Sequence, residues 1–369
     1  TQKAIKKVVT KLFLFIVFLF SFSNLGAMEK APYHHIYKDG FLYAFKNPKN
    51  GPQRDPNFKW KWKIFSEEKK KLKIDYPPEH VVNKQEVLKN LQKHQSDSFI
   101  MWLGHASFIL KLGNTTVITD AVFESNYGPL WFGPRRYVDV PLTLKELPKI
   151  DVIALTHNHY DHMSIRTIKN FPYKKSKVFV PLKLGKYFTR NGYSKNNVKE
   201  MDWYDKIQIN DELSITALPS QHWSKRWIWG SGNTDRSLWA SFLFEYKGKK
   251  IFFACDTGYG NIYKQLGNKY GPIDLTFINI GAYNFYPMAP QKDKSIYHTN
   301  PEEALSIGQD LKSKKVLGMH WGTVVLSLEP ILEPPKRFKE NASKYGFKEE
   351  DVIIFKIGQV ENLNKVLNN

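Results

Sequence analysis

The sequence predicts a layered α/β fold in which helices cover mixed β-sheets. Two observations lead to this prediction. From residue 98 onwards, short apolar runs come in pairs separated by tight turns, as antiparallel hairpins do. Later in the chain, helical patterns separate the apolar runs, which is typical of sheets with helices on their outer faces. The chain has 369 residues, which is enough for one domain of about 250–300 residues with a large core.

The predicted strands begin with a hairpin. Apolar runs occupy residues 99–103 and 108–112, and Gly113-Asn114 predicts a tight turn into a third strand at 117–119. A later hairpin turns at Gly248. After the first three, strands are predicted at residues 152–156, 178–182, 213–218, 241–246, 250–255, 275–280 and 316–319.

Helices are predicted between these strands and near both ends. Residues 84–94 and 163–170 have helical patterns. A helix at 301–311 begins with Pro301 and carries acidic residues in its first turn, as helix N-termini favour. A last helix ends over residues 338–345, where Gly346 stops it.

The N-terminus reads as a targeting segment. Four lysines within residues 1–11 precede an apolar run at 12–22 and small or polar residues at 23–27. This order is typical of a secretory signal peptide. The run is short for a membrane span of about 20 residues, yet a retained membrane anchor stays an alternative. We therefore expect an exported protein, periplasmic or membrane-associated, with a basic arm at 28–97 and a catalytic domain at 98–369.

The composition narrows the classes of partner and metal site. The formal net charge is +20, which favours anionic partners such as an acidic membrane surface, or is simply a solvated basic surface. No nucleic-acid motif is present, so nucleic acid is not an expected partner. Aromatic residues make up 15% of the chain, which fits either a lipid-facing groove or a tryptophan-rich core. A single cysteine excludes both an intramolecular disulfide and a four-cysteine zinc site.

A dense group of metal-ligand residues follows the strand predicted at 152–156. His157, His159, Asp161 and His162 lie within six residues. Imidazole and carboxylate are ligands that suit zinc, although manganese or iron can use the same set. The chain has only 11 histidines, so three of them in this short loop predict a metal site rather than a polar turn.

Three further candidate ligands also follow predicted strands. His222, Asp256 and His320 each come shortly after a buried apolar run. Singly, each side chain is better explained by a structural role. As a set at successive strand ends, they are expected to converge with the first group.

The run from His157 to His162 resembles the HxHxDH signature of metallo-β-lactamase-fold hydrolases. This resemblance implies a four-layer αββα sandwich with two zinc ions. Over about residues 98–360 the chain further resembles the N-acylphosphatidylethanolamine-hydrolysing phospholipase D family. The blocks that carry this resemblance are Trp102–Ala106, Thr119-Asp120, residues 151–161, Ser220–Trp223, Asp256–Tyr259, Ile280–Tyr283, Pro301–Ala304 and His320–Thr323.

The resemblance implies a division of the ligands between two zinc ions. One ion takes three imidazoles, the other takes one carboxylate and two imidazoles, and a second carboxylate bridges them. Asp161 and Asp256 are also catalytic, because they hold the metals that activate water. The implied ligands are His157, His159 and His222 for the first ion, Asp161, His162 and His320 for the second, and Asp256 for both.

Other polar residues are candidates for supporting roles. Asp120 is expected to orient a ligand imidazole, unless it only forms a turn. His105 is either close to the metals or a core histidine. By resemblance, His298 lies near the substrate phosphate and donates a proton to it or binds it; a surface histidine at a helix start is the alternative. Cys255 stands where the family usually has glycine.

Substrate contacts are expected from an aromatic and basic segment at 223–239. Trp223, Lys225 and Arg226 combine rings with cations, which suits a phospholipid headgroup, and Tyr283 is a further candidate. Ordinary core packing explains the same aromatics equally well.

These observations predict a zinc phosphodiesterase of phospholipase D type, acting on N-acylphosphatidylethanolamine-like lipids and releasing N-acylethanolamine and phosphatidic acid. A homodimer is compatible with the sequence. One alternative is another zinc hydrolase of the same fold, such as a lactonase, a β-lactamase or another phosphodiesterase. A second alternative is a non-enzymatic lipid-binding envelope protein.

Overall fold

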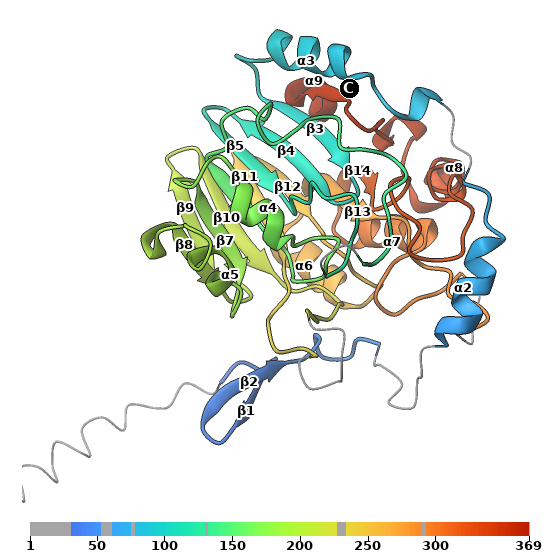
Figure 1. The fold of residues 1–369 in the computed structure, drawn as a ribbon, viewed down its shortest axis with the longest axis horizontal. Helices are drawn as coiled ribbons and strands as arrows, with labels where there is room; N and C mark the ends of the chain where they lie inside the picture. Colours follow the sequence, from blue (N-terminus) through green and yellow to red (C-terminus); the bar gives the residue numbers. More distant parts are fainter. Residues whose placement is uncertain are drawn as a thin grey trace, which may run out of the picture.

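The computed structural model describes residues 31–52, 61–74, 78–129, 132–226, 234–289 and 293–368. Two seven-stranded sheets lie face to face, and helices cover their outer sides (Figure 1). The predicted αββα layering is therefore confirmed. The expected leader or anchor at 1–27 lies outside the described residues, as do Trp227 and Trp229 of the aromatic segment. No helix within the described ranges has the length and apolar character that a membrane span requires.

The first sheet has the strand order β16-β3-β4-β5-β6-β7-β8. The neighbours β16, β3, β4 and β5 pair antiparallel, and the neighbours β5, β6, β7 and β8 pair parallel. Its strands are β3 (Phe99–Gly104), β4 (Ser107–Leu112), β5 (Thr115–Thr119), β6 (Val152–Ala154), β7 (Lys177–Pro181), β8 (Val198–Met201) and β16 (Val360–Asn362).

The second sheet has the order β15-β14-β13-β12-β11-β10-β9. Strands β9 to β12 pair antiparallel, and β12 to β15 pair parallel. Its strands are β9 (Lys206–Asn210), β10 (Leu213–Leu218), β11 (Ser241–Tyr246), β12 (Lys249–Phe253), β13 (Ile273–Asn279), β14 (Ser313–Met319) and β15 (Val352–Ile353).

The two sheets meet through fully buried apolar side chains. The ring of Phe108 on β4 lies 4.8 Å from that of Phe277 on β13 and 6.2 Å from that of Phe253 on β12, centroid to centroid. A second apolar cluster covers the other face of the first sheet and includes Ile168 and Phe188 from its covering helices. Burying each such side chain stabilises the fold by about 1.5–3 kcal/mol.

The helices pack on the outer faces of both sheets. Side chains of α3, α4 and α5 join the apolar cluster on the first sheet, and α7 contacts β13 and β14 of the second. The predicted start of α7 is confirmed by a capping box between Asn300 and Glu303. Gly346 ends the segment after α8 in the left-handed conformation, φ 78°. The helices are α2 (Trp62–Lys70), α3 (Lys84–Lys93), α4 (Ile165–Asn170), α5 (Gly185–Thr189), α6 (Ile262–Tyr270), α7 (Pro301–Asp310), α8 (Glu333–Glu340) and α9 (Leu363–Asn368).

The arm at 28–97 holds more structure than the sequence predicts. The sequence predicts one helix in this arm, at residues 84–94, which α3 confirms. The structure adds α2 and a hairpin of β1 (His35–Lys38) and β2 (Phe41–Phe45). Asp39 and Gly40 form its turn with φ 51° and 78°, the geometry that two-residue hairpin turns need. The hairpin stands apart from the two sheets in Figure 1.

Candidate metal centre

The loops that follow β6, β10, β12 and β14 carry the predicted metal ligands. The short strand β6 is buried and parallel to both neighbours, so the chain leaves it at the same edge of the sheet as β5. The next residues, His157, His159, Asp161 and His162, line the loop before α4. His157 and His162 have no exposed surface. Strand ends on both sheets thus place ligands in one region.

Three imidazoles form the first ligand group. Nε2 of His157 lies 2.8 Å from Nδ1 of His159, and Nε2 of His222 lies 3.2 Å from the same Nδ1. Nδ1 of His222 donates to the backbone carbonyl of Tyr297 at 3.0 Å, which leaves its Nε2 facing the group. The three nitrogens lie close enough together to coordinate one ion.

The second ligand group consists of Asp161, His162 and His320. Oδ2 of Asp161 lies 3.4 Å from Nε2 of His162 and 3.4 Å from Nε2 of His320. Oδ2 of Asp256 is 3.0 Å from each of the same two nitrogens. The same oxygen is 4.0 Å from Nε2 of His222 in the first group. Asp256 therefore lies between the two groups, where a bridging carboxylate is expected.

The donor atoms of this region fit metal ions. Within the described part of the chain, both carboxylate oxygens of Asp256 and Nε2 of His162 and His320 are buried without a hydrogen-bond partner. Buried polar atoms are rarely left unpaired, because each costs about 1–3 kcal/mol. Imidazole and carboxylate are also the ligands that zinc and similar transition metals take.

The protonation states of His157, His222 and Asp256 suit metal ligands. Burial, together with the neighbouring imidazoles, holds the pKa of His157 and of His222 well below the usual range, so both rings are neutral ligands. Burial alone raises the pKa of Asp256, but the imidazoles of His162 and His320 outweigh it and hold that pKa well below the usual range. The carboxylate is therefore ionised. Burial lowers the pKa of His320, but the carboxylates of Asp256 and Asp161 outweigh it and raise that pKa to about 9, so this ring gives up a proton when it binds a metal.

Asp120 lies where a supporting carboxylate is predicted. It is fully buried at the end of β5, and its Oδ2 accepts from Nδ1 of His162 at 2.7 Å. The backbone N–H and the hydroxyl of Thr156 also donate to this carboxylate, at 2.8 and 2.6 Å. Asp120 thus fixes the His162 ring with Nε2 directed at the centre. Thr156 is a contributor that its sequence position alone did not single out.

His105 and His298 both lie at the centre. Nε2 of His105 is 2.8 Å from Oδ2 of Asp161, and its backbone N–H donates to the hydroxyl of Thr323 at 2.9 Å. Nδ1 of His298 is 3.8 Å from Oδ2 of Asp256. Burial lowers the pKa of His298 to about 4, so its ring is neutral at pH 7.

The predicted substrate contacts divide into two sets. The ring of Trp223 lies 4.4 Å from that of His159, at the centre, and Lys225 is partly exposed nearby. The guanidinium of Arg226 instead lies 3.9 Å from the Tyr160 ring centroid and donates to backbone carbonyls of the ligand loop. Tyr283 is fully buried, and its hydroxyl donates to the carboxylate of Glu333 at 2.9 Å.

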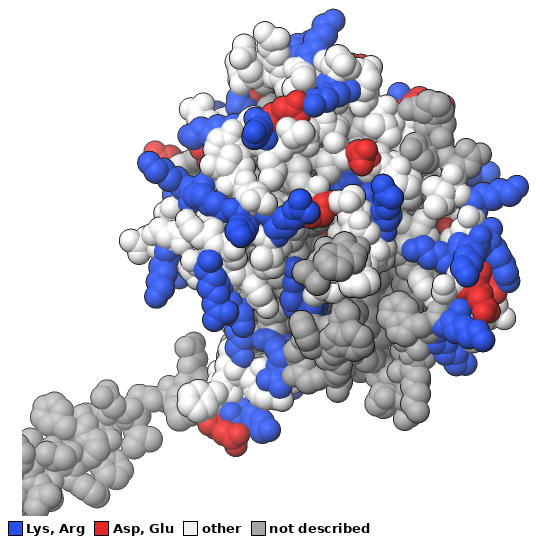
Figure 2. Space-filling view, viewed as in Figure 1, with Lys and Arg blue, Asp and Glu red and all other residues white. Residues whose placement is uncertain are grey.

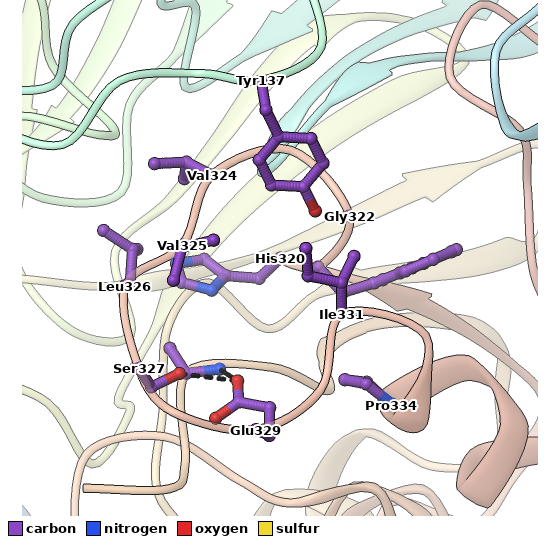
Figure 3. Close-up of a pocket in the computed structure, with 12 residues that line it drawn as sticks. Tyr137, His320, Gly322, Val324, Val325, Leu326, Ser327, Glu329, Ile331 and Pro334 are labelled. Carbon is purple, nitrogen blue, oxygen red and sulfur yellow. Dashed lines mark hydrogen bonds between the residues drawn. The ribbon is translucent and has the colours of Figure 1, made fainter. Parts of the chain in front are cut away.

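A small cavity of about 30 Å³ opens beside His320 (Figure 3). Tyr137, Val325 and Ile331 give it apolar walls. Glu329 lies at its floor and accepts from the backbone N–H groups of Ala282 and Asn284, at 2.6 and 3.1 Å. The hydroxyl of Ser327 donates to the same carboxylate at 2.6 Å. No pattern in the sequence pointed to this buried acid, which accepts all three of these hydrogen bonds.

The N-terminal arm also reaches the centre, which sequence reasoning missed. Oδ1 of Asn47 accepts from the backbone N–H of His222 at 2.9 Å. Nε2 of Gln221 donates to the carbonyl of Pro52 at 2.6 Å.

Cys255 also lies at the centre. Its Sγ is 3.4 Å from Nδ1 of His157, and its backbone has a left-handed conformation, φ 63°. This left-handed backbone explains why glycine is favoured at position 255, because glycine adopts a positive φ without steric cost.

Comparison with known proteins identifies the family. Residues 115–321 match the model described as the beta-lactamase superfamily domain. The chain is 34% identical over 255 residues to the mitochondrial N-acyl-phosphatidylethanolamine-hydrolyzing phospholipase D of Saccharomyces cerevisiae, covering 67% of this chain and 52% of that protein. It is 31% identical over 257 residues to N-acyl-phosphatidylethanolamine-hydrolyzing phospholipase D 1 of Caenorhabditis elegans, covering 67% of this chain and 70% of that protein. The matched region is thus about half of the yeast protein.

Solved structures share the fold. The isothiocyanate hydrolase from Delia radicum gut bacteria superposes with a TM-score of 0.55 at 17% identity, covering 71% of this chain and 98% of that one. Igni18, a metallo hydrolase from Ignicoccus hospitalis, gives 0.53 at 19% identity, covering 72% and 97%. These structures show the same fold, and the sequence matches place this chain in the beta-lactamase superfamily, as a metal-dependent hydrolase homologous to the N-acyl-phosphatidylethanolamine-hydrolyzing phospholipases D.

Proposed function

We propose that this protein is a zinc-dependent phosphodiesterase of phospholipase D type that hydrolyses N-acylphosphatidylethanolamine-like lipids. The observation that carries the proposal is the position of Asp256 between two ligand groups, in a chain homologous to enzymes named for this reaction. The matched region covers only part of those proteins, so their substrate is proposed for this chain on the basis of its site.

The reaction breaks the bond between phosphorus and the ethanolamine oxygen. A water oxygen bonds to phosphorus, and the products are phosphatidic acid and N-acylethanolamine. Two zinc ions bound by these residues would supply an activated water and offset charge on the phosphate oxygens. Asp161 and Asp256 would hold the ions and reduce their net charge.

Two histidines beside the ligands have distinct roles in this proposal. His298 is not among the seven assigned ligands, and its neutral ring can donate a hydrogen bond to a phosphate oxygen or to the departing alkoxide oxygen. The alkoxide takes up the proton that the attacking water gives up, which leaves N-acylethanolamine. His105 holds the carboxylate of Asp161 through a 2.8 Å contact and thereby orients that ligand.

The test is product analysis with matched variants. The purified chain is incubated with N-acylphosphatidylethanolamine in mixed micelles, and products are followed by mass spectrometry. Asp256→Asn is the inactive variant. Asp274→Asn is its control, because Asp274 bonds to Lys250 and Lys314 at the start of β13, away from the ligands. Metal content is measured for all three.

The proposal predicts N-acylethanolamine from the wild type and from Asp274→Asn, and none from Asp256→Asn. A preparation with about two zinc ions per chain that yields no product would exclude this substrate class. Nitrocefin, lactones and simpler phosphodiesters then test the other hydrolases of the fold. Lipid binding by metal-free protein without turnover would favour a non-enzymatic role.

A further inference from the structure

Exposed apolar side chains gather on the β1–β2 hairpin. The described residues contain eleven exposed large apolar or aromatic side chains, and four of them lie within residues 33–41. These are Tyr33, Ile36, Tyr37 and Phe41, with exposed fractions of 47%, 38%, 50% and 78%. The clustering distinguishes them from the single exposed apolar residues that any protein surface carries.

Burial changes sharply along the hairpin. At its base, Ala44 and Phe45 are buried, and Phe45 belongs to the main core. Phe41, directly after the turn at Asp39 and Gly40, is the most exposed of the eleven side chains. Packing of the base explains why the hairpin is folded. It does not explain an aromatic side chain at the tip, where turns normally carry polar residues.

Lysine side chains lie over Tyr33 of this cluster and over the neighbouring Tyr43. Nζ of Lys46 and of Lys49 lie 4.0 and 4.6 Å from the ring centroid of Tyr33, and Nζ of Lys38 lies 5.5 Å from that of Tyr43. Residues 31–52 contain three lysines and one carboxylate, that of Asp39, so this segment is positively charged. Figure 2 shows lysine and arginine side chains over much of this face of the molecule. Rings interleaved with lysines fit the headgroup region of an anionic bilayer.

The hairpin is bonded to the catalytic domain, and the residues just after it reach a metal ligand. The backbone N–H of Phe45 donates to the carbonyl of Asp235 at 2.8 Å, and Nζ of Lys183 donates to the carbonyls of Leu42 and Tyr43. Two residues after β2, Asn47 accepts from the backbone of His222. A bilayer that binds the hairpin tip is therefore held at a fixed position relative to the metal ligands.

We infer that the β1–β2 hairpin docks the protein on an anionic phospholipid bilayer, with Phe41 inserted among the headgroups and the lysines on lipid phosphates. This inference deepens the proposed function, because docking would set the metal centre against a surface of phospholipid substrate. The contact with lipid itself does not depend on which bond the centre hydrolyses.

The test places a fluorescent probe at the hairpin tip of the full chain. Cys255 is fully buried, so Phe41→Cys gives one accessible thiol for an environment-sensitive dye such as NBD. Leu88→Cys is the control, because Leu88 is 39% exposed on α3, which lies on the opposite side of the molecule in Figure 1. The vesicles are phosphatidylcholine with or without phosphatidylglycerol, and nitroxide lipids serve as quenchers.

We expect the dye at position 41 to shift to the blue and to be quenched by headgroup-level nitroxides when phosphatidylglycerol is present. The dye at position 88 stays in water. Adding Lys38→Glu and Lys46→Glu to Phe41→Cys reduces the shift, because each lysine near the surface strengthens binding to anionic lipid. Native metal content and circular dichroism show that each variant is folded.

Three outcomes would overturn the inference. They are no binding to vesicles, binding with the dye at position 41 still in water, and a blue shift that appears without vesicles when the protein concentration is raised. The last would mean that a second copy of the chain covers the hairpin. Failure of the proposed function looks different. If only the proposed function is wrong, the dye is buried in lipid while the product assay stays negative. If product forms but the dye stays in water, only the docking inference is wrong.

Discussion

Nδ1 of His162 donates to Oδ2 of Asp120 across 2.7 Å, and neither side chain has exposed surface. The contact joins the end of β5 to the ligand loop after β6. It selects the tautomer of His162 that presents Nε2 to Asp161 and Asp256.

Asp120→Asn is therefore expected to weaken metal binding by about 10- to 100-fold, the usual loss when a group that orients a ligand is changed. Competition with a chromogenic chelator measures the affinity. Asp274→Asn serves as the matched control and should bind metal like the wild type. Unchanged affinity in Asp120→Asn would mean that His162 is oriented by packing alone.

Asn47→Ala should lower the free energy of unfolding by about 1–3 kcal/mol, because the backbone N–H of His222 loses its acceptor. Metal affinity should fall with it, since His222 is a ligand. Asn47→Asp keeps an oxygen at this position and is expected to recover part of both losses. Asn196→Ala, an exposed asparagine, is the control. Urea unfolding and metal competition give the two readouts, and a variant equal to Asn196→Ala would refute the role of the arm.

Arg226→Lys should lower the free energy of unfolding by roughly 1–2 kcal/mol even without substrate. Lysine cannot both cover the Tyr160 ring and donate to the carbonyls of Asn158 and Met163. Lys225→Ala is the comparison. Wild-type stability of Arg226→Lys, combined with a raised KM, would instead support phosphate binding by Arg226.

Chelation should lower the thermal midpoint of the protein reversibly. Metal ions present at about 1,000 times their Kd stabilise the folded state by about 4 kcal/mol. Without them, buried oxygens and nitrogens around Asp256 lack partners. Scanning calorimetry before and after dialysis with EDTA, and again after zinc is restored, follows the change. A midpoint that does not move would argue against tightly held metal.

The thiol of Cys255 should resist labelling in the native protein and react fully in denaturant. Its side chain is fully buried, and burial raises its pKa well above the usual range, so the reactive thiolate is scarce. Reaction with DTNB measures the accessible thiol. Rapid reaction under native conditions would show that the centre opens, and would remove the basis for selective labelling at position 41.

Local patterns in the sequence predicted much of the fold and the ligand set. The strands predicted at 213–218 and 241–246 agree with β10 and β11 at both ends, because mostly apolar segments with polar residues beyond their ends define buried strands. Polar edge strands were missed. β9 alternates exposed and half-buried residues and includes lysine and asparagine, as edge strands often do.

Contacts between distant parts of the chain were not predictable in the same way. Asn47 and His222 are 175 residues apart, and no local pattern pairs them. Tyr283 belongs to a block that resembles the family, yet its hydroxyl bonds to Glu333 rather than facing the ligands. A motif identifies a residue but leaves the direction of its side chain undetermined.

The distribution of ligands over both sheets has a consequence for biosynthesis. While the ribosome is still making β11, the growing chain holds the imidazoles of the first group but neither Asp256 nor His320. The first sheet is also incomplete until β16 pairs with β3 near the C-terminus. A nascent chain that ends before His320 therefore lacks the complete ligand set, so the metal centre is assembled only after strands of both sheets have been made.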